Sequence, residues 1–156
     1  MEDRRRVVIT GMGAVTPLGK SVVEFWDGLI SGRSGVRPIT LCDASAYPCR
    51  IAGEVPNFDP VDYMSPKEAR RLARFSQLSI AASTMAVKDA NLNFDNEYSS
   101  MIGVLLGNGA GGLDTTQYAC LDMLEKGAMK INPFFIPMML PNMAAANVAR
   151  VFGAKG

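Results

Sequence analysis

Two kinds of hydrophobic pattern recur along this chain, and together they predict an α/β fold. Residues 7–10 are a β-branched run that predicts a buried strand, and residues 101–106 are an apolar run that predicts a strand covered on both faces of a sheet. Shorter extended pieces are predicted at 36–40 and 50–55, among prolines and glycines. Apolar residues at helical spacing lie between these runs. This alternation of strands and helices predicts a sheet layered between helices.

The helices are predicted from apolar residues that recur every three or four positions. Ser21 followed by Glu24 has the spacing of a capping box, and Gly32 marks the end of the first helix. Ser65 followed by Glu68 repeats the same start signal for the second helix. In chain order, the predicted helices span 22–30, 66 to about 91, about 114–126, and 143–152.

The stretch 131–143 is apolar but is broken by Pro133, Pro137 and Pro141. Three prolines remove three backbone donors and oppose a regular helix, so a loop is predicted. Loops usually run over the surface and are polar. An apolar loop is expected to be covered by another chain, by a ligand tail or by the rest of a larger domain.

Composition restricts the class of protein. The chain has 156 residues, of which 48% are hydrophobic and 20% charged, so one globular domain is predicted. The formal net charge of +1 predicts no bulk attraction to nucleic acid or to an anionic membrane. No apolar run approaches the ~18–20 residues of a membrane span, and the N-terminus lacks a secretory signal pattern, so a cytoplasmic location is expected.

The chain contains no histidine, which excludes Ser-His and Cys-His pairs and the commonest metal ligand from within it. Cys42, Cys49 and Cys120 have no metal-binding spacing and are predicted to be reduced thiols. Cys120 is expected in the middle of a helix as a buried small side chain, not as a nucleophile. The chain therefore predicts no catalytic residue, no metal site and no cofactor of its own.

Gly107, Gly109 and Gly112 fit the pattern G-x-G-x-x-G between a predicted strand and a predicted helix. Dinucleotide binding would also need a second strand that ends in an acidic residue roughly 20 positions further on, and the chain has none. A tight turn where backbones pack closely is the favoured interpretation. A nucleotide-binding domain remains an alternative, which a titration with NAD or ATP followed by Trp26 fluorescence would test.

Four stretches carry a resemblance to a known family: RRVVITGMGAVTPLG (5–19), FWDGLISGRSGV (25–36), MIGVLLGNGAGG (101–112), and NPFFIPMMLPNMAA (132–145) followed by FGAKG. In this order they resemble the β-ketoacyl-acyl-carrier-protein synthases, in particular the type II elongating condensing enzymes of bacterial fatty acid synthesis. The resemblance implies a thiolase-like layered α/β fold, of which residues 1–156 would be the N-terminal half with an incomplete mixed sheet.

The family's activity is an acyl transfer followed by decarboxylative condensation with malonyl-carrier protein. This chemistry needs an activated cysteine thiolate and two histidines. The family's cysteine lies in a T-A-C-A-like motif, which residues 1–156 do not contain. Residues 1–156 alone are therefore expected to show no condensing activity. A non-catalytic partner of the chain-length-factor type remains a second interpretation.

Positive charge gathers near the start of the helix predicted from Pro66, at Lys67, Arg70 and Arg71. A solvated helix face is the usual meaning of such charges. Cations at a helix N-terminus oppose the macrodipole, however, which favours a functional use. The resemblance implies that these three residues bind the acidic acyl carrier protein.

Three further residues receive roles from the resemblance. Ala110 matches a position that lines the acyl pocket, and its small side chain predicts room for longer acyl chains. Phe135 and Ile136 match residues that reach across a homodimer and help to close the partner's acyl tunnel. The resemblance thus implies a homodimeric enzyme that takes an acyl carrier protein as its partner.

Overall fold

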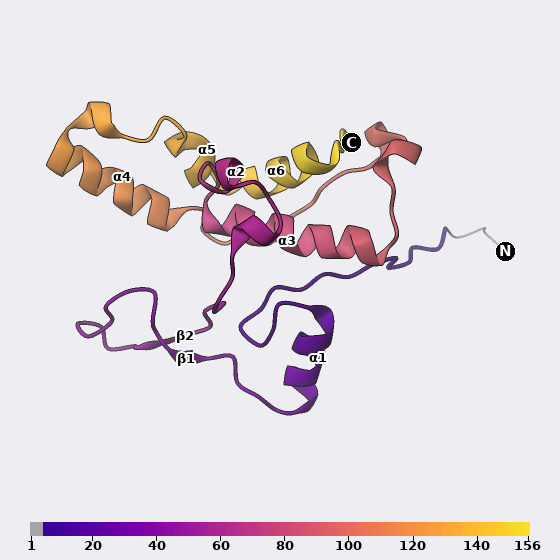
Figure 1. Cartoon of the computed structure of the whole chain (residues 1–156), viewed down its shortest axis with the longest axis horizontal. Helices are drawn as coiled ribbons and strands as arrows, with labels where there is room; N and C mark the ends of the chain where they lie inside the picture. Colours follow the sequence, from indigo (N-terminus) through magenta and orange to yellow (C-terminus); the bar gives the residue numbers. More distant parts are fainter. Residues whose placement is uncertain (1–4) are drawn as a thin grey trace. The chain divides into compact units, whose positions relative to one another are not determined.

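The computed structural model describes residues 5–156, which form two compact units (Figure 1). The first unit holds the described residues up to Phe58 together with Ala82–Leu92. The second holds Asp59–Ala81 and Asn93–Gly156. No helix among residues 5–156 is both long enough and apolar enough to cross a bilayer.

Helix α1 (Val22–Ile30) of the first unit begins and ends where the sequence predicts. The Ser21 Oγ accepts a hydrogen bond from the Glu24 N–H at 3.2 Å. In a regular capping box the glutamate carboxylate would accept a hydrogen bond from the Ser21 N–H. Here the Glu24 carboxylate accepts one from the N–H of the preceding residue, Lys20, at 2.7 Å. Gly32 follows the helix with a positive φ of 63°, as expected for a glycine stop.

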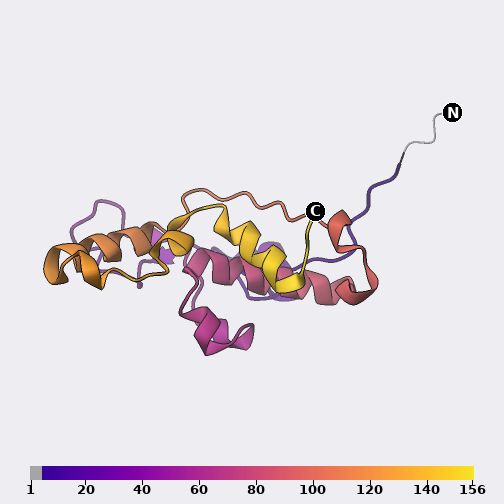
Figure 2. The same ribbon diagram turned by 90° about the horizontal axis from the view of Figure 1, so that it is seen from above.

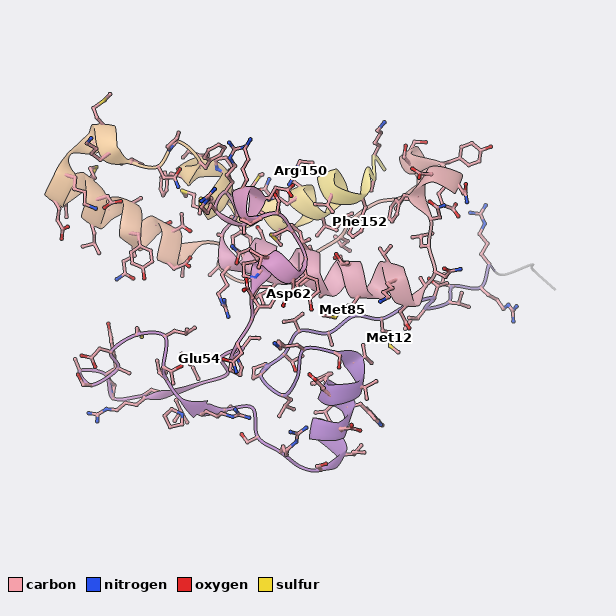
Figure 3. The ribbon with its side chains drawn as sticks, in the orientation of Figure 1. Met12, Glu54, Asp62, Met85, Arg150 and Phe152 are labelled. Atoms are coloured by element: carbon pink, nitrogen blue, oxygen red, sulfur yellow. The ribbon has the colours of Figure 1, made fainter. Side chains whose placement is uncertain are left out.

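The two short extended pieces predicted after α1 form an antiparallel hairpin, β1 (Arg37–Pro38) and β2 (Ile51–Ala52). The Glu54 carboxylate braces the hairpin by accepting hydrogen bonds from the backbone N–H groups of Thr40 and Leu41. Glu54 projects from this part of the chain in Figure 3. Among the described residues, β1 and β2 make the only sheet.

The prediction of strands at 7–10 and 101–106 is corrected: neither segment is a strand within residues 5–156, and Met101 ends a 3-10 turn. Val7 is 96% exposed and Leu105 is 99% exposed. Val104 of the second run packs against the core of the second unit, but most of both runs lies uncovered. The reason is that a strand needs a hydrogen-bonded neighbour as well as β-branched residues. The mixed sheet expected from the pattern is therefore not formed by these residues themselves.

The long helix predicted from Pro66 is also corrected, because it is divided into α2 (Pro66–Ala69) and α3 (Arg74–Asp89). Its start is confirmed: the Ser65 Oγ accepts a hydrogen bond from the Glu68 N–H at 3.3 Å. At the break, the Gln77 side chain donates to the carbonyl oxygens of Ala69 and Leu72, at 2.9 and 3.0 Å. The Ala69 carbonyl keeps only a long bond from the Leu72 N–H, at 3.3 Å, so the carboxamide stabilises the interruption.

The core of the second unit forms where α3 and α6 (Met143–Phe152) pack against each other, as Figure 2 shows. Ile80 of α3 is 1% exposed and Val148 of α6 is 4% exposed. The apolar cluster also contains Leu72, Met64, Val104 and Phe152. The ring of Phe152 stacks on that of Phe94 with 5.3 Å between centroids, which joins the end of α6 to the 3-10 turn Phe94–Asn96.

Helix α4 (Leu113–Lys126) follows the glycine-rich turn and ends at Gly127, as predicted. The proline-containing stretch is not a continuous loop, because it contains the short helix α5 (Phe135–Met139). Pro137 is the third residue of α5, a position where the N–H has no partner inside the helix. Its missing donor therefore costs little, and one helical turn tolerates it.

Short 3-10 turns complete the second unit, and α6 ends it. These turns span Pro60–Asp62, Ser99–Met101 and Ala128–Lys130. Asn142 precedes α6 as predicted, although its side chain makes no capping hydrogen bond, and Gly153 ends the helix in the left-handed conformation.

Candidate functional site

Two hydrogen bonds fasten the glycine-rich turn to the proline-containing stretch, and a third bond within the turn orients Asn108. The Asn108 Oδ1 accepts from the Gly111 N–H at 3.0 Å, and the Asn108 Nδ2 donates to the Pro141 carbonyl at 3.1 Å. The Gly112 N–H donates to the Met139 carbonyl at 3.1 Å. Two segments about 30 positions apart in sequence are thereby held backbone to backbone.

Two glycines make this contact possible. Gly111 has a φ of 69°, and a Cβ built on it would lie 2.7 Å from the Met139 carbonyl oxygen and 3.1 Å from the Pro141 nitrogen. Gly112 is buried, and a Cβ built on it would lie 3.1 Å from the Cα of Met139 in the proline-containing stretch. A Cβ on Gly109, by contrast, would meet nothing within 4 Å. The sequence pattern indicated close backbone packing but did not single out Gly111. The adjacent pair Gly111-Gly112 is the feature of the sequence that could have indicated it.

The three residues predicted to line the acyl pocket come from these two fastened segments. Ala110 is exposed in the glycine-rich turn, immediately before Gly111. Phe135 and Ile136 open α5, where Phe135 is half-buried and Ile136 is 55% exposed. The structure thus brings their backbone segments together and leaves part of their apolar surface open.

The basic residues Lys67, Arg70 and Arg71 are exposed around the end of α2. Arg70 is the C-cap of α2, which corrects the argument from the helix macrodipole. Because the helix is broken at this point, Arg70 and Arg71 follow a helix C-terminus, where positive charge is not disfavoured. Only Arg74 stands at a helix N-terminus, that of α3.

Two contacts hold this basic segment to neighbouring elements. The Arg71 guanidinium lies 4.6 Å from the ring centroid of Phe134, a cation–π distance. The Glu68 Oε1 lies 3.4 Å from the Arg150 Nη1, and Arg150 projects from α6 in Figure 3. The Ser65 hydroxyl, which donates to Glu68, is the largest cause of a lowered Glu68 pKa, and Arg150 contributes less.

A cleft of about 340 Å³ opens beside these contacts. Its walls are Glu68, Arg71, Leu72, Phe134, Pro137, Asn147 and Arg150. Asn147 is 6% exposed, and its Nδ2 is buried without a hydrogen-bond partner. Sequence reasoning missed this cleft, because its residues are separated by up to 82 positions and share no motif.

The three cysteines are free, as predicted, and all are exposed. The exposure of Cys120 corrects the expectation of a buried thiol. Cys120 lies on α4, none of whose residues is buried, so its apolar neighbours do not cover it. Residues 5–156 contain no group of three histidine, cysteine, aspartate or glutamate side chains placed to hold a metal ion.

Comparison with known proteins identifies relatives over nearly the whole chain. Residues 4–156 match the family model described as beta-ketoacyl synthase, N-terminal domain. The chain is 44% identical over 154 residues to a 3-oxoacyl-[acyl-carrier-protein] synthase 2 of Synechocystis sp.. The match covers 99% of this chain and 37% of that relative, so the chain spans little more than a third of the relative's length.

Solved structures give the same result for the fold. The ishigamide ketosynthase/chain length factor is similar with a TM-score of 0.86 and 31% identity, over 96% of this chain and 37% of that one. A type II PKS ketosynthase solved in complex with its acyl-carrier protein is similar with a TM-score of 0.77, over 97% of this chain and 40% of that one. Its identity is 22%, so it supports the fold alone. On the family match and the agreement in fold, this chain belongs to the β-ketoacyl synthase family, whose N-terminal domain it represents with the thiolase-like architecture.

Proposed function

We propose that this chain is the N-terminal part of a 3-oxoacyl-acyl-carrier-protein synthase that performs decarboxylative condensation in fatty acid biosynthesis. The observation that carries this proposal is the 44% identity to a synthase of that name across 99% of the chain. The order of the motifs, from the first extended run to the proline-containing stretch, adds to it.

The reaction has two stages. A cysteine thiol gives up its proton, and the resulting thiolate attacks the carbonyl carbon of the carrier protein's thioester. The bond to the carrier sulfur breaks, and that sulfur takes up the proton and leaves as a thiol. The malonyl thioester then loses CO₂, and the resulting carbanion attacks the acyl-cysteine thioester, forming a carbon–carbon bond and releasing the cysteine. Residues 1–156 contain neither the family's T-A-C-A-like cysteine motif nor a histidine, so they do not supply these groups. Residues 1–156 contribute docking charge, pocket wall and dimer surface.

The proposed docking site for the carrier protein is the set Lys67, Arg70 and Arg71. Three cationic side chains within five positions are exposed to solvent, which suits a charge-driven encounter with an acidic partner. The contact between Arg71 and Phe134 limits the freedom of one of these side chains, so less conformational entropy is lost on binding.

The proposed acyl pocket uses Ala110, Phe135 and Ile136. Their segments are fastened by the Asn108–Pro141 and Gly112–Met139 hydrogen bonds, so a change in one segment is transmitted to the other. The exposed apolar surface of Ile136 is suited to burial against a second copy of the protein, and we propose a homodimer on this basis. A chain-length-factor role remains the second candidate, because one structural relative carries that term in its name.

A chimera tests the proposal directly. Residues 1–156 would replace the matching residues of the Synechocystis synthase, and the product formed from acyl- and malonyl-carrier protein would be measured by mass spectrometry. We expect a 3-oxoacyl product and release of CO₂. A folded, dimeric chimera that binds the carrier protein but makes no product would refute the synthase assignment and favour the non-catalytic role. The separate 156-residue chain is expected to give no turnover.

A further inference from the structure

We propose that the cleft beside α2, α5 and α6 binds a carboxylate that is carried on a short apolar tail. This site is separate from the acyl pocket proposed above. Its donors are the guanidinium groups of Arg71 and Arg150 and the side-chain amide of Asn147, all three of which belong to the cleft wall.

The first argument is the orphaned amide. Asn147 is 6% exposed, and its Nδ2 has neither a protein acceptor nor access to solvent. A buried N–H donor without an acceptor destabilises a fold, and most buried polar groups are paired. Asn147 contributes to the wall of an open cleft, so an occupant that brings an acceptor oxygen would satisfy this donor once the carboxamide turns toward the cleft.

The second argument is charge. Two guanidinium groups face one carboxylate, that of Glu68, across the cleft wall. The ion pair between Glu68 and Arg150 is long, at 3.4 Å, and both side chains are about half exposed. Glu68 also accepts a hydrogen bond from the Ser65 hydroxyl at 3.0 Å. The wall therefore keeps an excess positive charge, which favours an anion over a neutral or cationic ligand.

The third argument selects the kind of anion. Leu72, Phe134 and Pro137 form the apolar part of the wall, so a bare ion would leave that surface without a partner. A volume of about 340 Å³ is at the small end of ligand sites, which suits a short-chain carboxylate. The head would be held by nitrogen donors and the tail by the ring and the aliphatic side chains.

The test follows the side-chain amide of Asn147 by ¹⁵N–¹H NMR of the purified protein during titration with hexanoate. Acetate is the control without the tail, and hexanol is the control without the charge, at matched ionic strength. We expect a saturable shift of the Asn147 amide with hexanoate, and binding at least about tenfold weaker for either control, because each lacks one of the two contacts.

Variants separate a built site from general charge attraction. Arg150→Gln and Asn147→Leu are each expected to weaken hexanoate binding by about tenfold or more; for Asn147→Leu the shifts are followed at the Arg71 and Arg150 Nε–H groups. Arg70→Gln removes an equal charge from a residue outside the cleft wall and is expected to leave the binding unchanged. No saturable shift in the unaltered protein, equal binding of acetate, or equal losses in Arg150→Gln and Arg70→Gln would each overturn the proposal.

This inference does not depend on the proposed function. Arg71 belongs both to the cleft wall and to the proposed docking set, whereas Asn147 and Arg150 are outside that set. Carrier binding by Asn147→Leu is therefore measured as a separate outcome. If carrier binding persists while hexanoate binding is lost, both proposals are supported. If hexanoate binding is intact while Arg70→Glu leaves carrier binding unaffected, the docking proposal fails and the carboxylate site stands.

Discussion

Replacing Gly111 with alanine should separate the glycine-rich turn from the proline-containing stretch. The new Cβ would stand 2.7 Å from the Met139 carbonyl oxygen and 3.1 Å from the Pro141 nitrogen, and these backbone atoms cannot rotate away. Its φ of 69° adds left-handed strain of about 1–2 kcal/mol for alanine. Overpacking against the backbone adds about 1–3 kcal/mol. The expected total loss in the free energy of unfolding is about 2–5 kcal/mol.

Two matched variants separate these contributions. Gly153→Ala has a similar φ of 73° but open space around the Cβ, so it should lose only the strain, about 1–2 kcal/mol. Gly109→Ala has open space and no positive φ, so it should be neutral or stabilising by up to about 1 kcal/mol. Urea denaturation followed by circular dichroism measures all three. A loss for Gly111→Ala no larger than that for Gly153→Ala would refute the close approach of the two segments.

The remaining predictions concern the charges and the pocket. Reversing Arg70 and Arg71 to glutamate should weaken carrier binding by the chimera at low salt. Rising salt should weaken carrier binding by the chimera without these substitutions, because charges further apart than about 10 Å are screened at 0.1 M. Carrier binding that calorimetry shows to be unaffected by both changes would contradict the docking assignment. Ala110→Phe should shift the chimera's products to shorter acyl chains, since the ring occupies pocket volume, and an unchanged product profile by mass spectrometry would reject that role. Ser65→Ala should raise the Glu68 pKa, measured by carbon NMR, because the hydroxyl that favours the carboxylate is removed. Because the Glu68 pKa is lowered in the folded state, Glu68 contributes stability that is present above its unfolded-state pKa and is lost as pH falls through its folded-state pKa. Ser65→Ala should therefore reduce the change in the free energy of unfolding with pH on the acid side. Identical dependence of that free energy on pH in both proteins would contradict this.

Local signals in the sequence were enough to locate most helix ends. Ser21 and Ser65 cap the helices that follow them, and Gly127 and Gly153 end the helices before them. These features depend on contacts within about one helical turn, so neighbouring residues determine them. The family was also recognisable from short motifs in their order, because each motif is contiguous in the chain.

Other features depended on residues that are far apart in sequence. At the break between α2 and α3, Leu72 is buried and the Gln77 side chain bonds to freed carbonyl oxygens. Leu72 fits the periodicity of one continuous helix, so the periodicity does not reveal the break. The apolar run at 7–10 has a strong strand pattern, but a ladder needs a neighbouring strand, and among the described residues it has none.

The sequence by itself thus determined most helix ends and the family to which the chain belongs. Only the tertiary structure placed Gly111 against Met139 and gathered Arg71, Asn147 and Arg150 around one cleft. The physical reason is range. Caps and periodic faces are satisfied within a few residues, whereas close backbone approach and convergent side chains arise only when distant segments pack together.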